Sequence, residues 1–417
     1  MTEVRDGLAL GGVPAQALAA AYGTPLLVID TDVLDRNVAL YAELAARHGL
    51  EVSYAGKALL FVALARRLAA SPLGLDVCSL GELLTAERAG FEPARLVLHG
   101  CGKTADELQA VAAGRVGRVV IDHFEELGQL AMLAEPARPM RALLRLNTGI
   151  EARTHAYVRT GGEDSKFGFS RADLPAAIAA VMAAPGLRLV GIHSHIGSQI
   201  FDEAPYAASL PIALEAYAQA RAAGAPVTDL VLGGGFGVDA VPGGEVFDVA
   251  SAAGDLAGEA AAAARRLGLS PPRLGLEPGR SIVAAAGTSL YRVVAVKAQG
   301  RRRFAIVDGG IADNPRPALY GAYHHPHLAG RCSGALPRET TVCGRSCEND
   351  RLVEAPLPED LRAGDLLALG TTGAYTYAMA SNYNRFGRPA VAFAGGGVHR
   401  LVVRREAAAD VLRNDVE

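Results

Sequence analysis

Lys57 is the first residue of this sequence whose type and position could carry chemistry. It directly follows the strand-like run LEVSYAG, in a chain whose only lysines are Lys57, Lys103, Lys166 and Lys297. An amine at the end of a buried strand loses solvation, which shifts it toward the neutral form that attacks an aldehyde. Lys57 is therefore a candidate Schiff-base lysine, and a solvated surface lysine is the alternative.

Two later stretches could bind a phosphate and an aromatic ring. The GGGFG run contains Gly233 to Gly235, where missing side chains let backbone N–H groups approach an anion. The HSHIGSQ run places His195 and Ser198 after another strand-like segment, so that an imidazole could stack on a flat ring and a hydroxyl could bond a phosphate. A plain tight turn and a core histidine are the respective alternatives.

The EPGRS stretch contributes Glu277 and Arg280. A carboxylate that faces a pyridine nitrogen keeps it protonated, and this turns the ring into an electron sink. A salt bridge between Glu277 and Arg280 is the other interpretation of the pair.

Eight strand-like runs that alternate with Ala-rich helical stretches would position these residues. Alternation of this kind indicates parallel βαβ units, and eight of them form a closed (β/α)₈ barrel with its chemistry at the carboxyl ends of the strands. The polar residues at those ends are Lys57, Asp76, His99, Asp122, Asn147, His195, the Gly233 to Gly235 run and Glu277.

Beyond residue 280 the pattern changes to strand-like runs separated by turns, which predicts a second, mostly β domain. The early run LLVID, Leu26 to Asp30, is expected to pair with this domain. We therefore predict an α/β protein with a (β/α)₈ TIM barrel over residues 35–280 and a β-rich domain formed by residues 1–34 and 281–417.

Composition narrows the class of protein further. With 417 residues, 50% of them hydrophobic, and a net charge of -3, the chain is ordinary for a globular protein and favours neither nucleic acid nor a membrane as a partner. The five cysteines form no CxxC pair and are expected to be reduced. The start MTEVRDGLALGG lacks the pattern of a signal peptide, and no apolar run is long enough to span a membrane, so a cytoplasmic location is expected.

No metal site is predicted. The HHPH cluster, with His324, His325 and His327, could suggest one, but Pro326 interrupts regular structure and no carboxylate lies near in sequence. We expect this segment to be a loop.

The ordered set of motifs resembles the fold-type III pyridoxal-phosphate decarboxylases. The matching stretches include YAGKAL, GLDVCSLGEL, GIHSHIGSQ, LGGGFG, EPGRS, RPALYGAYH, CEND and TTGAYTYAMASNYN. The resemblance implies pyridoxal 5'-phosphate as cofactor and a homodimer with shared active sites. It also implies a small-molecule amino-acid substrate, meso-2,6-diaminopimelate, which would be decarboxylated to L-lysine and CO₂.

The resemblance also implies residue roles. Lys57 would hold the cofactor covalently, His195 would stack on its ring, and Glu277 would face the ring nitrogen. The implied cofactor-binding set is Lys57, Asp76, His195, Ser198, Gly233, Gly234, Gly235, Glu277, Pro278, Gly279, Arg280 and Tyr375. The implied substrate-binding set is Arg280, Arg316, Tyr320, Glu348 and Tyr375.

Cys347 completes the implied catalytic set with Lys57 and His195, as the acid that protonates the α-carbon after CO₂ leaves. A substrate with a second carboxylate suits this set, because two Arg side chains can hold it by charge-assisted hydrogen bonds.

The sequence departs from the family pattern at three places. Leu59 and Cys101 each stand where the family commonly has Asn, and the segment after Glu348 is one residue shorter than usual. Alternatives are a decarboxylase of the same fold that acts on ornithine, lysine or a specialised substrate, an alanine-racemase-like enzyme, and a cofactor carrier without catalysis.

Overall fold

The computed structural model describes all residues except 1, 5–6, 151–163, 242 and 417. The chain divides into two compact units. One contains residues 38–237 and 246–279, and the other contains residues 1–37, 238–245 and 280–417. The grouping of residues 238–245 with the second unit was not indicated by the sequence pattern.

The first unit is a closed barrel of eight parallel strands, as predicted. Around the barrel the order is β10-β11-β12-β5-β6-β7-β8-β9. The strands are β5 (Glu51–Ala55), β6 (Gly74–Val77), β7 (Leu96–Leu98), β8 (Arg118–Ile121), β9 (Met140–Arg145), β10 (Leu187–His193), β11 (Asp229–Val231) and β12 (Arg273–Leu276).

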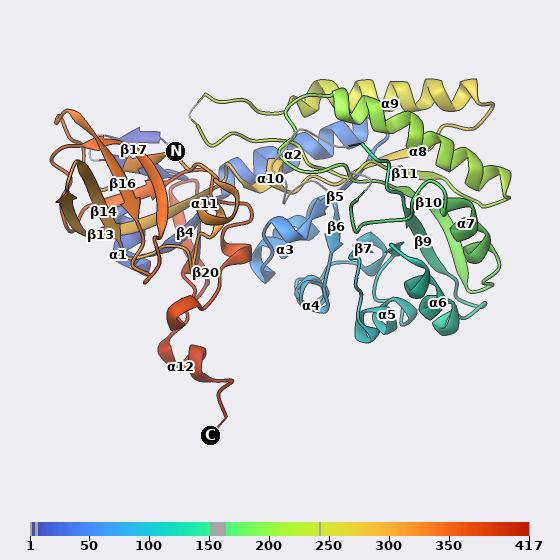
Figure 1. Ribbon diagram of the computed structural model, residues 1–417, viewed down its shortest axis with the longest axis horizontal. Coiled ribbons are helices and arrows are strands. Elements are labelled where there is room, and N and C mark those ends of the chain that lie inside the picture. The colour runs from blue at the N-terminus through green and yellow to red at the C-terminus, as the bar shows by residue number, and fades with distance from the viewer. Residues whose placement is uncertain (1, 5–6, 151–163, 242, 417) are drawn as a thin grey trace. The chain divides into compact units, whose positions relative to one another are not determined.

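Helices lie outside the barrel strands (Figure 1). They are α3 (Val62–Ala69), α4 (Leu80–Arg88), α5 (Ala105–Ala112), α6 (Phe124–Leu133), α7 (Leu174–Met182), α8 (Ala204–Ala222) and α9 (Val249–Arg266). The helix α2 (Thr31–His48) leads into the barrel from the second unit. Side chains fix several helix starts: Ser79 caps α4, and Thr104 with Glu107 forms a capping box on α5.

The barrel interior is packed, and its amino-terminal end is closed by ion pairs. Val97, Val120, Leu143, Val190 and Val231 form an apolar cluster of buried residues. At the first residues of four strands, Arg118 pairs with Glu51 and Asp229, and Arg273 pairs with the same two carboxylates. Charge is compensated at this end, so the polar groups left for chemistry lie at the other.

The second unit is built on a mostly antiparallel sheet with the path β17-β16-β14-β13-β4-β19-β20, from which β18 and β15 branch. Its strands are β4 (Leu26–Asp30), β13 (Gly287–Gln299), β14 (Arg302–Val307), β15 (Pro326–Leu328), β16 (Pro337–Cys343), β17 (Arg351–Pro358), β18 (Leu366–Leu369), β19 (Ala390–Gly395) and β20 (Val398–Val403). The strand β4 pairs with β13 and β19, which confirms the predicted place of LLVID.

The expectation of a loop at the HHPH cluster was wrong. Pro326–Leu328 form β15, which pairs antiparallel with β18. Pro326 is the first residue of a strand with one partner in the described chain, a position where a missing N–H is tolerated.

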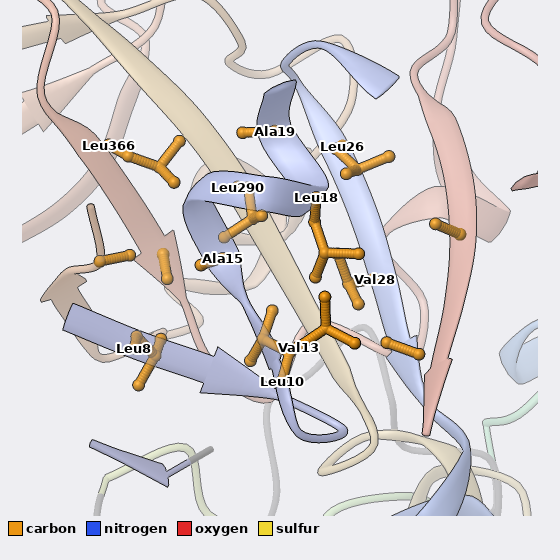
Figure 2. Packing of buried hydrophobic residues seen from close by; sticks show 14 of the residues in the cluster. Leu8, Leu10, Val13, Ala15, Leu18, Ala19, Leu26, Val28, Leu290 and Leu366 are labelled. Atoms are coloured by element: carbon orange, nitrogen blue, oxygen red, sulfur yellow. The ribbon is translucent and has the colours of Figure 1, made fainter. Parts of the chain in front are cut away.

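Short elements near the amino terminus cover one face of this sheet. They are β1 (Thr2–Val4), β2 (Gly7–Leu10), β3 (Val13–Pro14) and α1 (Ala15–Tyr22). Figure 2 shows Leu10, Val13 and Leu18 packed against sheet residues that include Val28 and Leu290. Burial of these side chains, at about 25 cal/mol per Å² of apolar surface, attaches the amino-terminal segment to the domain formed by the distant half of the chain.

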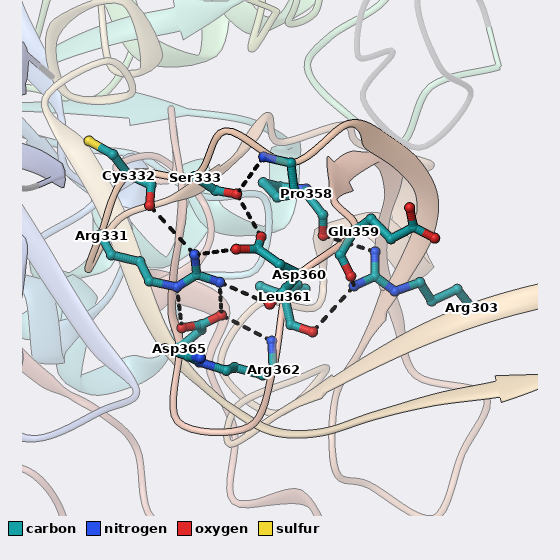
Figure 3. Close-up of polar contacts among 11 residues, drawn as sticks. Arg303, Arg331, Cys332, Ser333, Pro358, Glu359, Asp360, Leu361, Arg362 and Asp365 are labelled. Atoms are coloured by element: carbon teal, nitrogen blue, oxygen red, sulfur yellow. Dashed lines mark hydrogen bonds and ion pairs between the residues drawn. The ribbon is translucent and has the colours of Figure 1, made fainter.

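Two arginines tie together the turns at one edge of the β-rich unit (Figure 3). Arg331 makes paired hydrogen bonds of 2.9 Å to both carboxylate oxygens of Asp365 and bonds Asp360 at 2.8 Å. Arg303 donates to the carbonyl oxygens of Pro358 and Glu359, each at 3.0 Å. These bonds satisfy turn carbonyls that no strand reaches.

The remaining helices of the second unit are short: α10 (Arg280–Val283), α11 (Arg316–Tyr320) and α12 (Ala408–Leu412). No helix in the described part of the chain is long and apolar enough to cross a membrane. All five cysteines are free.

Asp313 is a carboxyl group removed from water inside the β-rich unit. It accepts hydrogen bonds from the Tyr291 hydroxyl at 2.6 Å and the Gly310 N–H at 2.7 Å. Burial raises the pKa of Asp313 to about 7, although these two hydrogen bonds oppose the rise.

We predict that Asp313→Asn flattens the pH dependence of stability. Between pH 4 and 7 the folded chain holds a proton on Asp313 that the unfolded chain releases, so stability falls as the pH rises through this range. The variant should gain about 3 kcal/mol relative to the parent between these limits. Urea unfolding at several pH values measures this, with the exposed Asp255→Asn as control; equal pH slopes in Asp313→Asn and the parent would contradict the assignment.

Candidate active site

Backbone contacts join the loop that carries Lys57 to the loop after β12. Lys57 lies in a short 3₁₀ turn (Gly56–Ala58) directly after β5. The Ala55 N–H donates to the Pro278 carbonyl at 3.0 Å, and a side chain at Gly279 would press against Ala58. Lys57 itself is exposed, so the expected burial of its amine was wrong: the 3₁₀ turn carries it beyond the strand to the open end of the barrel.

The loops after β10 and β11 are also joined. The Ile200 N–H donates to the Gly235 carbonyl at 3.0 Å, and the Tyr206 hydroxyl donates to the Gly234 carbonyl at 2.8 Å. Ser198 lies in the first of these loops, so the structure brings it together with the glycine run. The Glu277 N–H donates to the Gly233 carbonyl at 2.8 Å and links the run to the next strand.

The glycine run leaves no room for side chains. Gly233 has a φ of 72°, and a Cβ on it would lie 2.5 Å from Nδ1 of His195. A Cβ on Gly234 would collide with the Glu277 carbonyl, and one on Gly235 with the Gly197 carbonyl. The three glycines are therefore required by close backbone approach, and they form a concave loop of the kind that binds anions.

His195 is held as a neutral ring. Burial and the positive charges of Lys57 and Arg145 lower its pKa well below the usual value. A neutral imidazole beside the glycine run presents a flat apolar face without adding charge.

Asp76 is the next-to-last residue of β6 and is 4% exposed. Burial and the nearby charge of Glu277 raise its pKa well above the usual value, while Lys57 opposes the rise. Neither carboxylate oxygen of Asp76 completes a hydrogen bond in the described chain.

Glu277 is a carboxylate that faces two histidine side chains of the barrel. Its Oε2 lies 3.1 Å from Nε2 of His193, and its Oε1 lies 3.4 Å from Nε2 of His99. Burial alone would raise the pKa of Glu277, but the two imidazoles lower it below the usual value. Glu277 is therefore ionised.

Several residues of this end were not identified as site residues from the sequence. His193 is the last residue of β10, and Arg145 is the last residue of β9. Arg145 lies 3.5 Å from Asp122, and its guanidinium stacks over Phe167 at 4.3 Å. Strand parity gave no signal for His193, because β10 is continuously buried from Leu189 onward and its register shifts between Leu189 and Gly191.

Lys103 was noted only as a rare lysine. Its Nζ bonds Glu126 Oε1 at 2.7 Å, and both side chains are nearly inaccessible. It also donates to the carbonyls of Gly100 and Val120. The ion pair of Lys103 and Glu126 therefore has a structural role, which is to connect the loop after β7 with β8 and α6.

No metal was predicted from the sequence, and we assign none. His99, His193 and Glu277 do have ligand-type atoms within 4.8 Å of one another. His193 Nε2 and Glu277 Oε2 already face each other at hydrogen-bond distance.

The β-rich unit groups the predicted residues Arg280, Arg316, Tyr320 and Tyr375. The guanidinium of Arg280 lies 4.8 Å from the Tyr375 ring centre, and that of Arg316 lies 5.7 Å from the same ring and 5.1 Å from the Tyr320 ring. Burial and the charge of Arg280 lower the pKa of Arg316 to about 10. No carboxylate of the described chain forms an ion pair with Arg316, so the pair is suited to receive an anion.

Cys347 and Glu348 are exposed and lie in a separate place in the same unit. The Tyr383 hydroxyl donates to Glu348 at 2.6 Å, and the Cys347 N–H donates to the Asn384 side chain at 3.4 Å. Asp350 anchors their loop through bonds from Ser346 at 2.7 Å and the Ile311 N–H at 2.8 Å.

The barrel residues fit a planar cofactor that carries an aldehyde and a phosphate. The glycine loop offers N–H groups to a phosphate, His195 a neutral ring face, and Glu277 a negative charge, while Lys57 supplies the amine at the same end of the barrel. The carboxyl oxygens of Asp76, which complete no hydrogen bond in the described chain, could bond a polar group of the cofactor at this end of the barrel.

Comparisons with known proteins agree with this description. A protein of Actinosynnema pretiosum subsp. auranticum named diaminopimelate decarboxylase is 47% identical over 420 residues, which cover 99% of this chain and 93% of the relative. The crystal structure of diaminopimelate decarboxylase from Helicobacter pylori complexed with L-lysine is 30% identical with a TM-score of 0.87, covering 95% of this chain and 98% of that one. The crystal structure of diaminopimelate decarboxylase from M. jannaschi is 29% identical with a TM-score of 0.90, covering 100% and 97%.

The family model for the pyridoxal binding domain of pyridoxal-dependent decarboxylases matches residues 32–284. This range contains all eight barrel strands and every barrel residue described above. The chain therefore belongs to the family of pyridoxal-dependent decarboxylases.

Proposed function

We propose that this chain catalyses the pyridoxal-phosphate-dependent decarboxylation of meso-2,6-diaminopimelate to L-lysine and CO₂. The observation that carries the choice of substrate is the pair of buried arginines, Arg280 and Arg316, which both lie near the Tyr375 ring. Arg316 has no carboxylate partner in the described chain. Two neighbouring guanidinium groups therefore suit a substrate that keeps a second carboxylate. Substrates such as ornithine have none to offer.

The barrel residues would hold the cofactor. Lys57 would bind it covalently, Gly233 to Gly235 and Ser198 would bind its phosphate, and His195 would cover one ring face. Glu277, with Pro278 and Gly279 fixing its loop, would hold a proton at the ring nitrogen. When bound, pyridoxal phosphate supplies an electron sink for the electron pair left by CO₂.

The residues of the β-rich unit would hold and protonate the substrate. Arg280, Arg316 and Tyr320 would bind the distal carboxylate, and Glu348 the distal ammonium group. The Cys347 thiol would donate the proton that replaces CO₂ at the α-carbon. Tyr375, which has a φ of 59°, would contact both cofactor and substrate.

We also propose a homodimer in which Cys347 and Glu348 of one chain serve the barrel of the other. The exposure of both residues within their own chain supports this assembly. The five free cysteines agree with a cytoplasmic location, where thiols stay reduced.

We predict that Gly234→Ala weakens cofactor binding by about tenfold or more, because the added Cβ displaces the Glu277 carbonyl and with it the carboxylate. Gly258→Ala in α9 is the matched control, since a Cβ there meets no atom within 4 Å. Titration of the cofactor-free protein, followed by visible absorbance, gives both affinities. Equal affinities in the two variants would contradict the placement of the glycine loop.

We predict that CO₂ release is fastest from meso-2,6-diaminopimelate in a panel with L-ornithine, L-lysine and D- and L-configured diamino acids. Arg316→Met should raise KM for diaminopimelate about tenfold or more through loss of a charge-assisted hydrogen bond, with little effect on the slow turnover of lysine. Faster release from ornithine by the parent protein would overturn the substrate assignment. Racemisation without gas release would overturn the reaction itself.

We predict that Lys57→Ala and Cys347→Ala complement each other when the two inactive chains are refolded together. A mixed dimer has one barrel with Lys57 that receives Cys347 from its partner, so random mixing should restore about a quarter of the parent activity. Lys57→Ala alone should lack the visible absorbance of the bound cofactor, whereas Cys347→Ala should keep it. Absence of recovery in the mixture would place Cys347 and Lys57 of one site on the same chain.

A further inference from the structure

Two carboxyl groups share the buried floor of the barrel end. Asp76 is the next-to-last residue of β6, and Glu277 follows β12. Nε2 of His99 lies between them, 3.6 Å from Asp76 Oδ1 and 3.4 Å from Glu277 Oε1. Two buried carboxylates that face the same imidazole repel one another, so one of them holds a proton.

The two carboxyl groups differ in the side chains that face them. The Ser53 hydroxyl is the smallest of the influences on the pKa of Asp76, whereas a ring nitrogen of His193 lies at hydrogen-bond distance from Glu277. His193 Nε2 lies 3.1 Å from Glu277 Oε2, and the His193 residue is 1% exposed. Nδ1 of His193 has no hydrogen-bond partner in the described chain, so the tautomer with its proton on Nε2 fits. His193 is therefore a donor directed at Glu277, whereas no donor of the described chain, the Ser53 hydroxyl included, completes a hydrogen bond with Asp76.

His99 also lowers the pKa of Glu277, but by less than His193 does. Nε2 of His99 faces both carboxyl groups at similar distances and completes a hydrogen bond with neither. Burial lowers the pKa of His99 to about 3, so the ring is neutral at physiological pH. A neutral ring adds no net charge, so the hydrogen bond from His193 is the larger influence on Glu277.

We propose that His193 is a positioning residue whose hydrogen bond makes Glu277, and not Asp76, the ionised member of this buried pair. The charge would then face the ring nitrogen of the cofactor, a consequence that rests on the proposed function. Glu277 Oε2 keeps one lone pair beside its bond to His193, and Oε1 keeps both, so the carboxylate can still accept a further hydrogen bond. The opposite directions of the pKa shifts of Asp76 and Glu277 agree with this division.

The matched variants His193→Gln and His193→Asn test the proposal. Both carry an amide, but a Gln amide nitrogen reaches the place of Nε2, and an Asn amide nitrogen stops near Nδ1. Infrared difference spectra against the parent, recorded on the full chain freed of cofactor, report which carboxyl group is protonated. His193→Asn should gain a protonated glutamic-acid band and lose an aspartic-acid band, while His193→Gln should show neither change.

Two controls assign the bands. ¹³C-labelled glutamate should shift the gained band, and Glu277→Gln in the His193→Asn background should remove it. Asp76→Asn should remove the aspartic-acid band from the parent spectrum. His193→Phe, which keeps a ring in the cavity, should repeat the result of His193→Asn if that variant does not fold.

The loaded enzyme gives the second readout. His193→Asn should lower kcat about 10- to 100-fold, the equivalent of one lost hydrogen bond to a charged group, and His193→Gln should recover most of it. Unchanged bands in both His193→Asn and His193→Phe, or the same band changes in His193→Gln, would overturn the role of His193. Failure of the proposed function would instead appear as a parent protein that releases no CO₂, whatever the infrared result.

Discussion

Backbone hydrogen bonds that continue past the ends of the barrel strands hold the candidate site. Ala55 donates to Pro278, Glu277 donates to Gly233, and Ile200 donates to Gly235. Each bond joins the ends of two neighbouring barrel strands, and together the bonds fix Lys57, Glu277, the glycine run and Ser198 relative to one another. Substitutions at Gly233 or Gly234 would disturb these backbone hydrogen bonds directly, because a Cβ at either position collides with atoms of a neighbouring loop.

The sequence indicated the strand ends well because they depend on local information. Hydrophobic runs that end in a polar residue or glycine identify where each barrel strand stops, and closure of the barrel then brings these ends together. The pairing of β4 with β13 and β19 followed from the same pattern. The exposure of Lys57 did not follow, since the 3₁₀ turn that carries it beyond the strand depends on packing against the loop after β12. The strand at Pro326 was also unexpected, because the tolerance of a proline depends on which edge of the sheet it occupies.

Contacts between residues far apart in sequence set the electrostatics of the site, and these were the least predictable. The bond between His193 and Glu277 joins residues 84 positions apart, and the pair of Lys103 and Glu126 is formed across two loops. The sequence motif predicted that Glu277 faces the ring nitrogen of the cofactor, but it could not identify the group that keeps Glu277 ionised. The residue type and position of a histidine at the end of a strand do not show whether its ring stacks on a ligand, donates a hydrogen bond or packs in the core.

Charged groups are paired at one end of the barrel and partly unpaired at the other. The paired end stabilises the fold, and the other end carries the candidate site. At the amino-terminal end, Arg118 and Arg273 share Glu51 and Asp229, so every charge in that set has a partner. At the carboxyl end, Asp76 completes no hydrogen bond with the described residues, and neither does Nδ1 of His193. In the β-rich unit, Arg316 is likewise buried and forms no ion pair with a carboxylate of the described residues. Leaving buried polar groups unpaired costs about 1–3 kcal/mol for each group, and a ligand that supplies the missing partner recovers this cost on binding. The positions where the fold forgoes stability are therefore the positions where a charged cofactor and an anionic substrate would bind most favourably.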